Sequence, residues 1–319
     1  PNNVPFLDRQ AAIGSLPAAL PSSFYNVQGK IRLNRVQKEL EVSVPNYERI
    51  KQAFREWYAQ DEFAIIYRED RGFRAMKCSK RGNDVYAWRL KQRLENLQRL
   101  CDAFENVKLF GNEGDKVSVL FITLTYDTKK KTPKEAWQDV GEDWNNFHSA
   151  LERKYGKVHE FRVWESTAKG YPHIHAVLMF EEANKFTTFR YNGIWRIQEK
   201  HDLEQYHHSN IDVEPVQTVG GIKYLLKYLT KVHEKDRDEK RDLTLGMMWL
   251  FRKRAYGISE GFVQGLENMI ADSFYNTQGK ISYRLDPLKH NSNQKMLQTT
   301  LEGEIIPELP WTFVGIFSK

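Results

Sequence analysis

One stretch of the sequence, Gly-Tyr-Pro-His-Ile-His-Ala-Val-Leu-Met-Phe at residues 170–180, constrains the fold strongly. Gly and Pro near its start indicate a turn, and the unbroken apolar run at its end indicates a strand. Side chains alternate between the two faces of a strand, so His173 and His175 point the same way while Ile174 points the opposite way. The stretch therefore predicts a strand that presents two imidazoles side by side.

Two imidazoles held on a rigid strand are suited to a divalent metal ion, because neutral imidazole is a good ligand for several such ions. A third ligand is expected from Glu165, which follows the apolar segment at residues 161–164 and can reach the same ion across a hairpin. A carboxylate beside two imidazoles favours Mn²⁺ or Mg²⁺ and leaves positions open for substrate. The alternative for an arbitrary His-x-His is a pair of ordinary surface residues, and a second element bears on that choice.

The second element is an amphipathic helix predicted at residues 220–232. At about 100° per residue, its apolar face is formed by Ile222, Leu225, Leu226, Leu229 and Val232. The opposite face carries Tyr224, Lys227, Tyr228 and Lys231. Tyrosines that belonged to the core would share the leucine stripe. These two do not, which favours a chemical role for them.

Three motifs, in this order, resemble those of the HUH endonucleases, in particular the two-tyrosine rolling-circle replication initiators (Rep proteins) of single-stranded DNA phages and of bacterial and archaeal plasmids. Residues 121–126, Phe-Ile-Thr-Leu-Thr-Tyr, look like the first strand motif. Glu165 with residues 171–175 looks like the metal motif, and Tyr-x-x-Lys-Tyr at residues 224–228 looks like the nucleophile helix. The resemblance covers residues 117–233 and says little about either flank.

The resemblance implies site-specific nicking and joining of single-stranded DNA at a replication origin. Attack by Tyr224 would leave a 5′-phosphotyrosyl bond and a 3′-hydroxyl that a polymerase can extend, and Tyr228 would serve the termination transfer. A free phenol, with a pKa of about 10, is a poor nucleophile at neutral pH. Lys227, one turn from Tyr224, is expected to favour the phenolate. The expected partners are origin DNA and a host polymerase and helicase.

Two alternatives remain open from the sequence. A transposase of the same superfamily would use the same catalytic residues and differ in its flanks and its DNA target. A non-catalytic nucleic-acid-binding module could also be built on the same sheet topology, since fold does not determine function.

Composition sets broader limits. The formal charge of +6 and a pI of about 9.0 permit nucleic-acid binding without requiring it. No apolar run approaches the length of a membrane span, and the first residues have no signal-peptide character, so a cytoplasmic protein without membrane contact is expected. The chain begins at Pro1 rather than Met, which is consistent with a fragment of a longer protein.

Periodicity predicts an α+β fold: an antiparallel sheet with helices on one face, as in an HUH/RRM-like nuclease core. Thr-Pro-Lys-Glu at residues 132–135 is a capping box that starts a helix with an aromatic core stripe. A glycine-rich break near residue 111 suggests an N-terminal extension at 1–110 that has a possible DNA-binding role, a nuclease domain at 111–235 and a C-terminal extension at 236–319. Both extensions are expected to be helical.

Outside the motifs, the loop before a helix predicted at residues 85–104 interleaves cations and an aromatic ring. Lys80 and Arg81 are candidates for phosphate contacts and Tyr86 for base stacking, with a merely solvated loop as the alternative. Further candidate DNA contacts are Lys231, Arg252 and Lys253. Three histidines between the metal motif and the helix are interpreted as surface or DNA-contacting residues: His201, His207 and His208.

A nonapeptide, Ser-Phe-Tyr-Asn-x-Gln-Gly-Lys-Ile, occurs at residues 23–31 and again at 273–281 with one difference, Val27 against Thr277. The similarity stops at the ends of the peptide, so it is not a domain duplication. A turn at Asn-x-Gln-Gly with an outward tyrosine is one interpretation of it.

Overall fold

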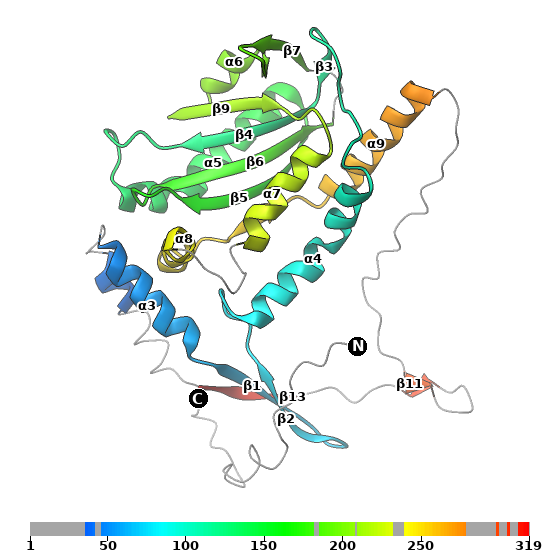
Figure 1. Cartoon of the computed structure of the whole chain (residues 1–319). Coiled ribbons are helices and arrows are strands. Elements are labelled where there is room, and N and C mark those ends of the chain that lie inside the picture. The colour runs from blue at the N-terminus through cyan, green and yellow to red at the C-terminus, as the bar shows by residue number, and fades with distance from the viewer. Residues whose placement is uncertain are drawn as a thin grey trace.

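The computed structural model describes residues 36–41, 46–181, 185–207, 209–231, 239–278, 298–299, 305–306 and 312–318. Its centre is a five-stranded sheet of order β10-β5-β6-β4-β9, in which every pair of neighbours is antiparallel (Figure 1). The strands are β4 (Val119–Thr125), β5 (Val158–Ser166), β6 (Pro172–Phe180), β9 (Asn210–Pro215) and β10 (Tyr256–Ile258). The predicted α+β class with an antiparallel sheet is confirmed.

Helices cover both faces of this sheet rather than the one face predicted. Consecutive residues of β5 show this, because their side chains point to opposite faces. Arg162 lies over the Trp144 ring of α5 (Pro133–Tyr155), 5.0 Å from its centroid, whereas the Phe161 ring is 5.9 Å from that of Phe262 in α9 (Phe262–Gln278). The strands β5 and β6 are buried on both sides, and such strands need a cover on each face.

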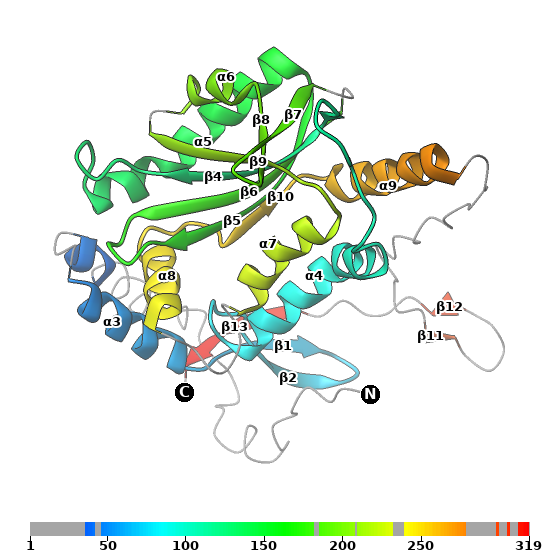
Figure 2. The ribbon, with the colours of Figure 1, turned by 45° about the horizontal axis from the view of Figure 1, so that its top comes forward.

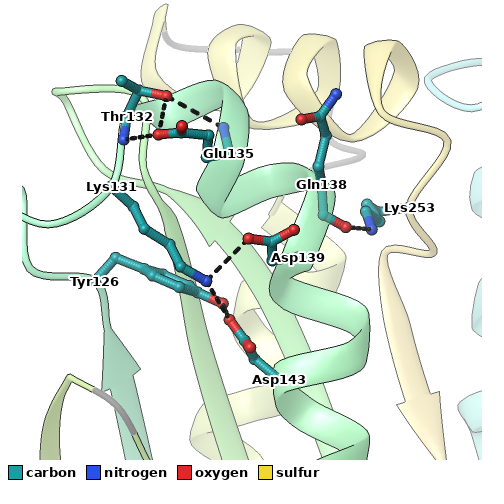
Figure 3. A network of polar contacts seen from close by, with 8 residues as sticks. All are labelled: Tyr126, Lys131, Thr132, Glu135, Gln138, Asp139, Asp143 and Lys253. Atoms are coloured by element: carbon teal, nitrogen blue, oxygen red, sulfur yellow. Dashed lines mark hydrogen bonds and ion pairs between the residues drawn. The ribbon is translucent and has the colours of Figure 1, made fainter.

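The helix α5 begins with the predicted capping box. The Thr132 hydroxyl accepts from the Glu135 backbone N–H, and the Glu135 carboxylate accepts from the Thr132 backbone N–H (Figure 3). Lys131 forms ion pairs with Asp139 and Asp143 (3.0 and 3.1 Å). The Tyr126 hydroxyl donates to Asp143 (2.6 Å), so this network ties the first turns of α5 to the residue that follows β4.

The apolar stripe of α5 is part of the core, as predicted: Trp137, Val140, Trp144, Phe147 and Leu151 are all buried. The helix ends at Gly156, whose φ of 82° lies in the region that favours glycine. The other face of the sheet contacts α7 (Gly220–Lys231), α8 (Glu239–Leu250) and α9. Figure 1 shows α7 in front of the sheet and α5 behind it.

The two flanks pack together beside the central sheet. The N-terminal flank contributes α3 (Tyr47–Ala59), β1 (Glu62–Arg68), β2 (Gly72–Lys77) and α4 (Asp84–Ala103). A strand from the far end of the chain, β13 (Thr312–Ser318), pairs with β1 to give a sheet of order β13-β1-β2. The extensions are thus partly helical, as predicted, and both also form strands, because residues 62–77 make a hairpin that turns just before Gly72 (φ 65°). The proposed domain boundaries stay predictions.

The remaining elements are short. A small sheet of order β3-β7-β8 is formed by β3 (Lys116–Val117), β7 (Phe186–Tyr191) and β8 (Ile194–Ile197), and α6 (Lys200–Glu204) follows it. Two two-residue strands, β11 (Gln298–Thr299) and β12 (Ile305–Ile306), pair with each other. None of the helices in the described ranges has both the length and the apolar character needed to cross a bilayer.

The repeated nonapeptide is only partly visible in this fold. In the second copy, residues 273–278 form the end of α9, so its Asn-x-Gln segment is helical and not the turn suggested above. The first copy, at residues 23–31, lies outside the described residues.

Candidate active site

The register of the central sheet brings the predicted triad together. Glu165 of β5 lies directly opposite His173 of β6, and Thr123 of β4 lies directly opposite His175. Directly opposed residues share a face, so Glu165, His173 and His175 all project from one side of the sheet. The hairpin arrangement expected from the sequence is therefore present, while the role of the three residues as metal ligands stays a prediction.

The side chains of the triad approach one another closely. The rings of His173 and His175 have centroids 4.5 Å apart, and His175 Nε2 is 3.7 Å from Glu165 Oε2. Glu165 and His175 are 9 % and 8 % exposed. On its other nitrogen, His175 Nδ1 is hydrogen-bonded to the Thr123 hydroxyl at 3.2 Å. A partner of this kind fixes the orientation of an imidazole and directs its second nitrogen, here toward Glu165.

The donor set suits a divalent ion that is not yet enclosed. Across the described ranges, no three His, Cys, Asp or Glu side chains are grouped as a formed metal site would group them. Oxygen and nitrogen ligands at about 2.1 Å from one ion lie roughly 3–4 Å apart, and the 3.7 Å between Glu165 and His175 falls in that range. Closing the set requires that the neighbouring ring of His173 offer a nitrogen to the same point. Two imidazoles and a carboxylate fit Mn²⁺ or Mg²⁺ better than a softer ion that prefers thiolates.

The helix α7 has the predicted amphipathic arrangement. Four positions of its apolar stripe are buried: Ile222, Leu225, Leu226 and Leu229. On the opposite face Tyr224 is 51 % exposed and Lys227 is exposed. Val232 and the side chains of Tyr228 and Lys231 lie outside the described part of the structure. The helix therefore packs through its leucines and presents Tyr224 outward.

Phe121 connects the exposed tyrosine to the triad. Its ring centroid is 6.1 Å from that of Tyr224 and 5.9 Å from that of His175. Phe121 and Thr123 alternate with buried residues of β4 on the face that carries His175. The sequence contained this signal, because Phe121 and Thr123 share a strand face in the first motif. Sequence reasoning assigned neither residue a role.

A second contact that sequence reasoning missed fixes the start of α7. The Gly220 N–H donates to the Glu105 carbonyl (3.0 Å) just after α4, and a Cβ at Gly220 would lie 3.1 Å from that oxygen. Lys223 forms ion pairs with Asp102 and Glu105 (both 2.9 Å), and its hydrogen bonds to Glu105 and Asp102 raise its pKa. The residue beside Tyr224 thus anchors the helix to α4.

Comparison with known proteins bears on this same stretch. Residues 119–233 match the family model of the ORF2-type replication-associated proteins. The match supports a role in the initiation of replication. It begins at the first residue of β4 and ends just beyond α7, so it includes the triad and both tyrosines. No curated protein and no solved structure matches the chain.

Lys80, predicted to contact phosphates, has a structural role instead. It is 5 % exposed, and its ammonium group donates to the carbonyls of Trp57 and Gln60 and pairs with Glu62 (3.1, 2.8 and 2.8 Å). An ammonium has three N–H donors, and these three acceptors occupy them. The prediction is wrong for Lys80 because the loop docks against the end of α3.

The other predicted DNA contacts divide into two groups. Arg81, Tyr86 and Arg252 line a cleft between α3, α4 and α8. Lys253 donates to the Gln138 carbonyl of α5 at 2.9 Å, and burial lowers its pKa (Figure 3). Lys253 therefore links the segment after α8 to α5.

The histidines between the metal motif and α7 also differ from one another. His201 is exposed, as expected. His207 is 7 % exposed, and its ring lies 6.1 Å from the rings of both Tyr126 and Phe147. The surface interpretation is wrong for His207, because the turn after α6 folds it back against the core. His208 lies outside the described residues.

Proposed function

We propose that this chain nicks single-stranded DNA at a replication origin through a 5′-phosphotyrosyl intermediate on Tyr224, and so initiates and terminates rolling-circle replication in the manner of a two-tyrosine HUH initiator. The observation that carries the proposal is the placement of Phe121 between Tyr224 and His175. It puts an exposed nucleophile and the predicted metal triad on the same face of one sheet. The family match over this stretch supports the same function.

In the proposed reaction, the phenol oxygen of Tyr224 attacks the scissile phosphorus. A phosphorus–oxygen bond to the tyrosine forms, the bond to the 3′-oxygen breaks, and the strand leaves with a 3′-hydroxyl. Transfer of the phenolic proton accompanies the attack, and the exposed cation of Lys227 on the same helix favours the phenolate. The phosphodiester energy is kept in the new bond, so a later attack by a 3′-hydroxyl rejoins DNA without ATP. A host polymerase would extend the free end, and a helicase would supply single strands.

Glu165, His173 and His175 are the residues that would hold Mn²⁺ or Mg²⁺. Such an ion acts as a Lewis acid on the scissile phosphate and helps to orient the strand for in-line attack. The hydrogen bond from Thr123 to His175 Nδ1 keeps that ring turned toward Glu165. The anchoring of α7 by Lys223 holds Tyr224 over the same face.

The test is a comparison of two tyrosine variants on a labelled origin oligonucleotide with Mn²⁺. Tyr224→Phe is expected to abolish the covalent adduct, while Tyr228→Phe still nicks and forms the adduct but fails to pass the strand to a second oligonucleotide. Loss of the adduct in Tyr228→Phe alone would reverse the two roles. Wild-type activity in both variants would place the nucleophile elsewhere. Cleavage of transposon ends in preference to an origin would favour the transposase alternative.

A further inference from the structure

A cleft outside the motif-bearing core collects cations from three parts of the chain. Its volume is about 770 Å³, within the range of roughly 300–1,000 Å³ that is usual for small-ligand sites. Four arginines line it: Arg81 from the loop before α4, Arg89 and Arg93 from α4, and Arg252 after α8. No carboxylate is among the described residues that line it. The cleft therefore favours an anionic ligand.

Three of the four arginines are not neutralised by neighbouring acids. Within the described ranges, Arg81, Arg89 and Arg93 form no ion pair with a carboxylate. Arg81 donates through Nη2 to the Lys253 carbonyl, and its Nε and Nη1 are buried without a partner of normal hydrogen-bond geometry among those same residues. Buried guanidinium donors are normally paired, so this arrangement indicates a missing acceptor.

Arg252 occupies a position that usually belongs to glycine. The Lys253 N–H bonds to the Met248 carbonyl and the Arg252 N–H to the Trp249 carbonyl, which is the Schellman pattern at the end of α8. Arg252 has the left-handed conformation of that motif, with a φ of 54°. A non-glycine residue is strained in this conformation, and such strain accumulates at functional sites. The side chain kept in spite of the strain lines the cleft.

Aromatic rings complete the lining: Trp57, Tyr86, Trp249 and Tyr256. The rings of Trp57 and Trp249 pack 5.7 Å apart. The indole N–H of Trp249 is buried and has no hydrogen-bond acceptor in the part of the chain that the structure describes. Phosphate-binding arginines interleaved with ring faces are the combination that binds single-stranded nucleic acid.

The cleft lies beside the triad. Tyr256 of β10 is directly opposite Val163 of β5, which in turn is directly opposite His175 of β6, so Tyr256 shares the face of the sheet that carries the triad. Glu165 is only two residues, or about 7 Å, farther along β5. Figure 2 shows α3 and α8 on one side of α7 and α4 on the other. A strand cut at Glu165 reaches Tyr256 by continuing along the sheet edge.

We propose that this arginine cleft binds one or more nucleotides of the single-stranded DNA substrate next to the nick, with arginines on the phosphates and an aromatic ring on a base. The proposal rests on the proposed function for the identity of the strand. The chemistry recognised is that of a nucleotide, which a free nucleoside triphosphate also offers. Experiments must therefore separate a strand from a free nucleotide.

The decisive variant is Arg89→Ala with Arg93→Ala, tested in a Tyr224→Phe background that leaves the DNA intact. Both arginines are exposed on α4, so the fold is expected to persist. The matched control is Lys91→Ala, which removes a cation from the opposite side of the same helix. The probe is fluorescent oligothymidylate of about 20 nucleotides, long enough for the site sizes of such grooves.

Loss of two phosphate contacts to a single strand is expected to reduce the slope of log K against log salt by about 1.4. Lys91→Ala should keep the wild-type slope. Tyr256→Leu should weaken binding by about 5- to 150-fold if it stacks a base. Equal slopes and affinities for the double variant and the control would overturn the proposal. So would loss of binding to a fluorescent nucleoside triphosphate with unchanged oligonucleotide binding.

The cleft and the nicking activity can fail separately. With Tyr224 restored, the double arginine variant should form the adduct at a rate near that of wild type once DNA is saturating. If the wild-type chain formed no adduct while the arginine variant still bound oligothymidylate more weakly, nicking would be wrong and the cleft would stand. An adduct in wild type with no change in binding would reject the cleft alone.

Discussion

The two faces of the central sheet treat ionisable groups differently, although the same strand supplies both. Under α5, Glu160 accepts from the Trp144 indole (2.7 Å) and pairs with Arg162, which lies over the Trp144 ring. On the opposite face, Glu165 faces His175 at 3.7 Å, and Tyr224 is half exposed nearby. Charge is neutralised and sealed by rings on the first face, whereas it remains near a reactive hydroxyl on the second. Alternation along β5 thus separates packing from chemistry.

The largest expected effect breaks the comparison from the chemical side. Replacing both His173 and His175 with Ala should lower nicking more than about a thousandfold, or about 4 kcal/mol in the barrier, because the metal site is lost. Single-stranded DNA binding should be largely kept, since phosphate contacts elsewhere supply most of it. Gel assays of cleavage and anisotropy of binding measure the two quantities. Full cleavage by this variant in EDTA would exclude the metal assignment.

The next effect comes from the packing face. Trp144→Ala should reduce the free energy of unfolding by about 3–5 kcal/mol, because a fully buried ring is lost, while nicking per folded molecule stays near wild type. Urea denaturation and adduct assays below the unfolding transition give the two numbers. Trp144→Phe is the control, since it keeps a ring and loses the hydrogen bond to Glu160. A fully stable Trp144→Ala protein without nicking activity would mean that the α5 face takes part in the chemistry.

The smallest effect sharpens the same comparison at the start of α5. Hydrogen bonds from Thr132 lower the pKa of Glu135 below its ordinary value of 4.5. A lowered pKa in the folded state stabilises the fold above the unfolded pKa, and that contribution is lost as pH falls through the folded pKa. Thr132→Ala should cost about 1 kcal/mol and reduce this acid dependence, while Thr132→Ser restores both. Thermal melts between pH 3 and 7 test it, and identical pH profiles for Thr132→Ala and wild type would contradict it.

Local pattern predicted those parts of the molecule that local pattern controls. The capping box of α5, the leucine stripe of α7 and the hairpin that sets Glu165 opposite His173 each depend on residues near one another in sequence. Their spacing carries the information, because a helix repeats every 3.6 residues and a strand every two. Tyr86, Arg89 and Arg93 also lie at helical spacing, and that signal in α4 was present but unused.

Tertiary packing decided what spacing could not. Lys80 and Arg81 are adjacent, yet one is buried in acceptors of α3 and the other lines the arginine cleft. The cleft is assembled from segments far apart in the chain, and the pairing of β1 with β13 joins residues about 250 apart. No local period encodes such contacts. The burial of His207 has the same cause.

The most direct test of the central claim is to map the covalent adduct. The chain is incubated with single-stranded origin DNA and Mn²⁺, digested with protease and nuclease, and its peptides are sequenced by mass spectrometry. The account predicts a nucleotide attached through its 5′-phosphate to Tyr224. A nucleotide on a residue outside α7, or no adduct with any divalent metal, would contradict it.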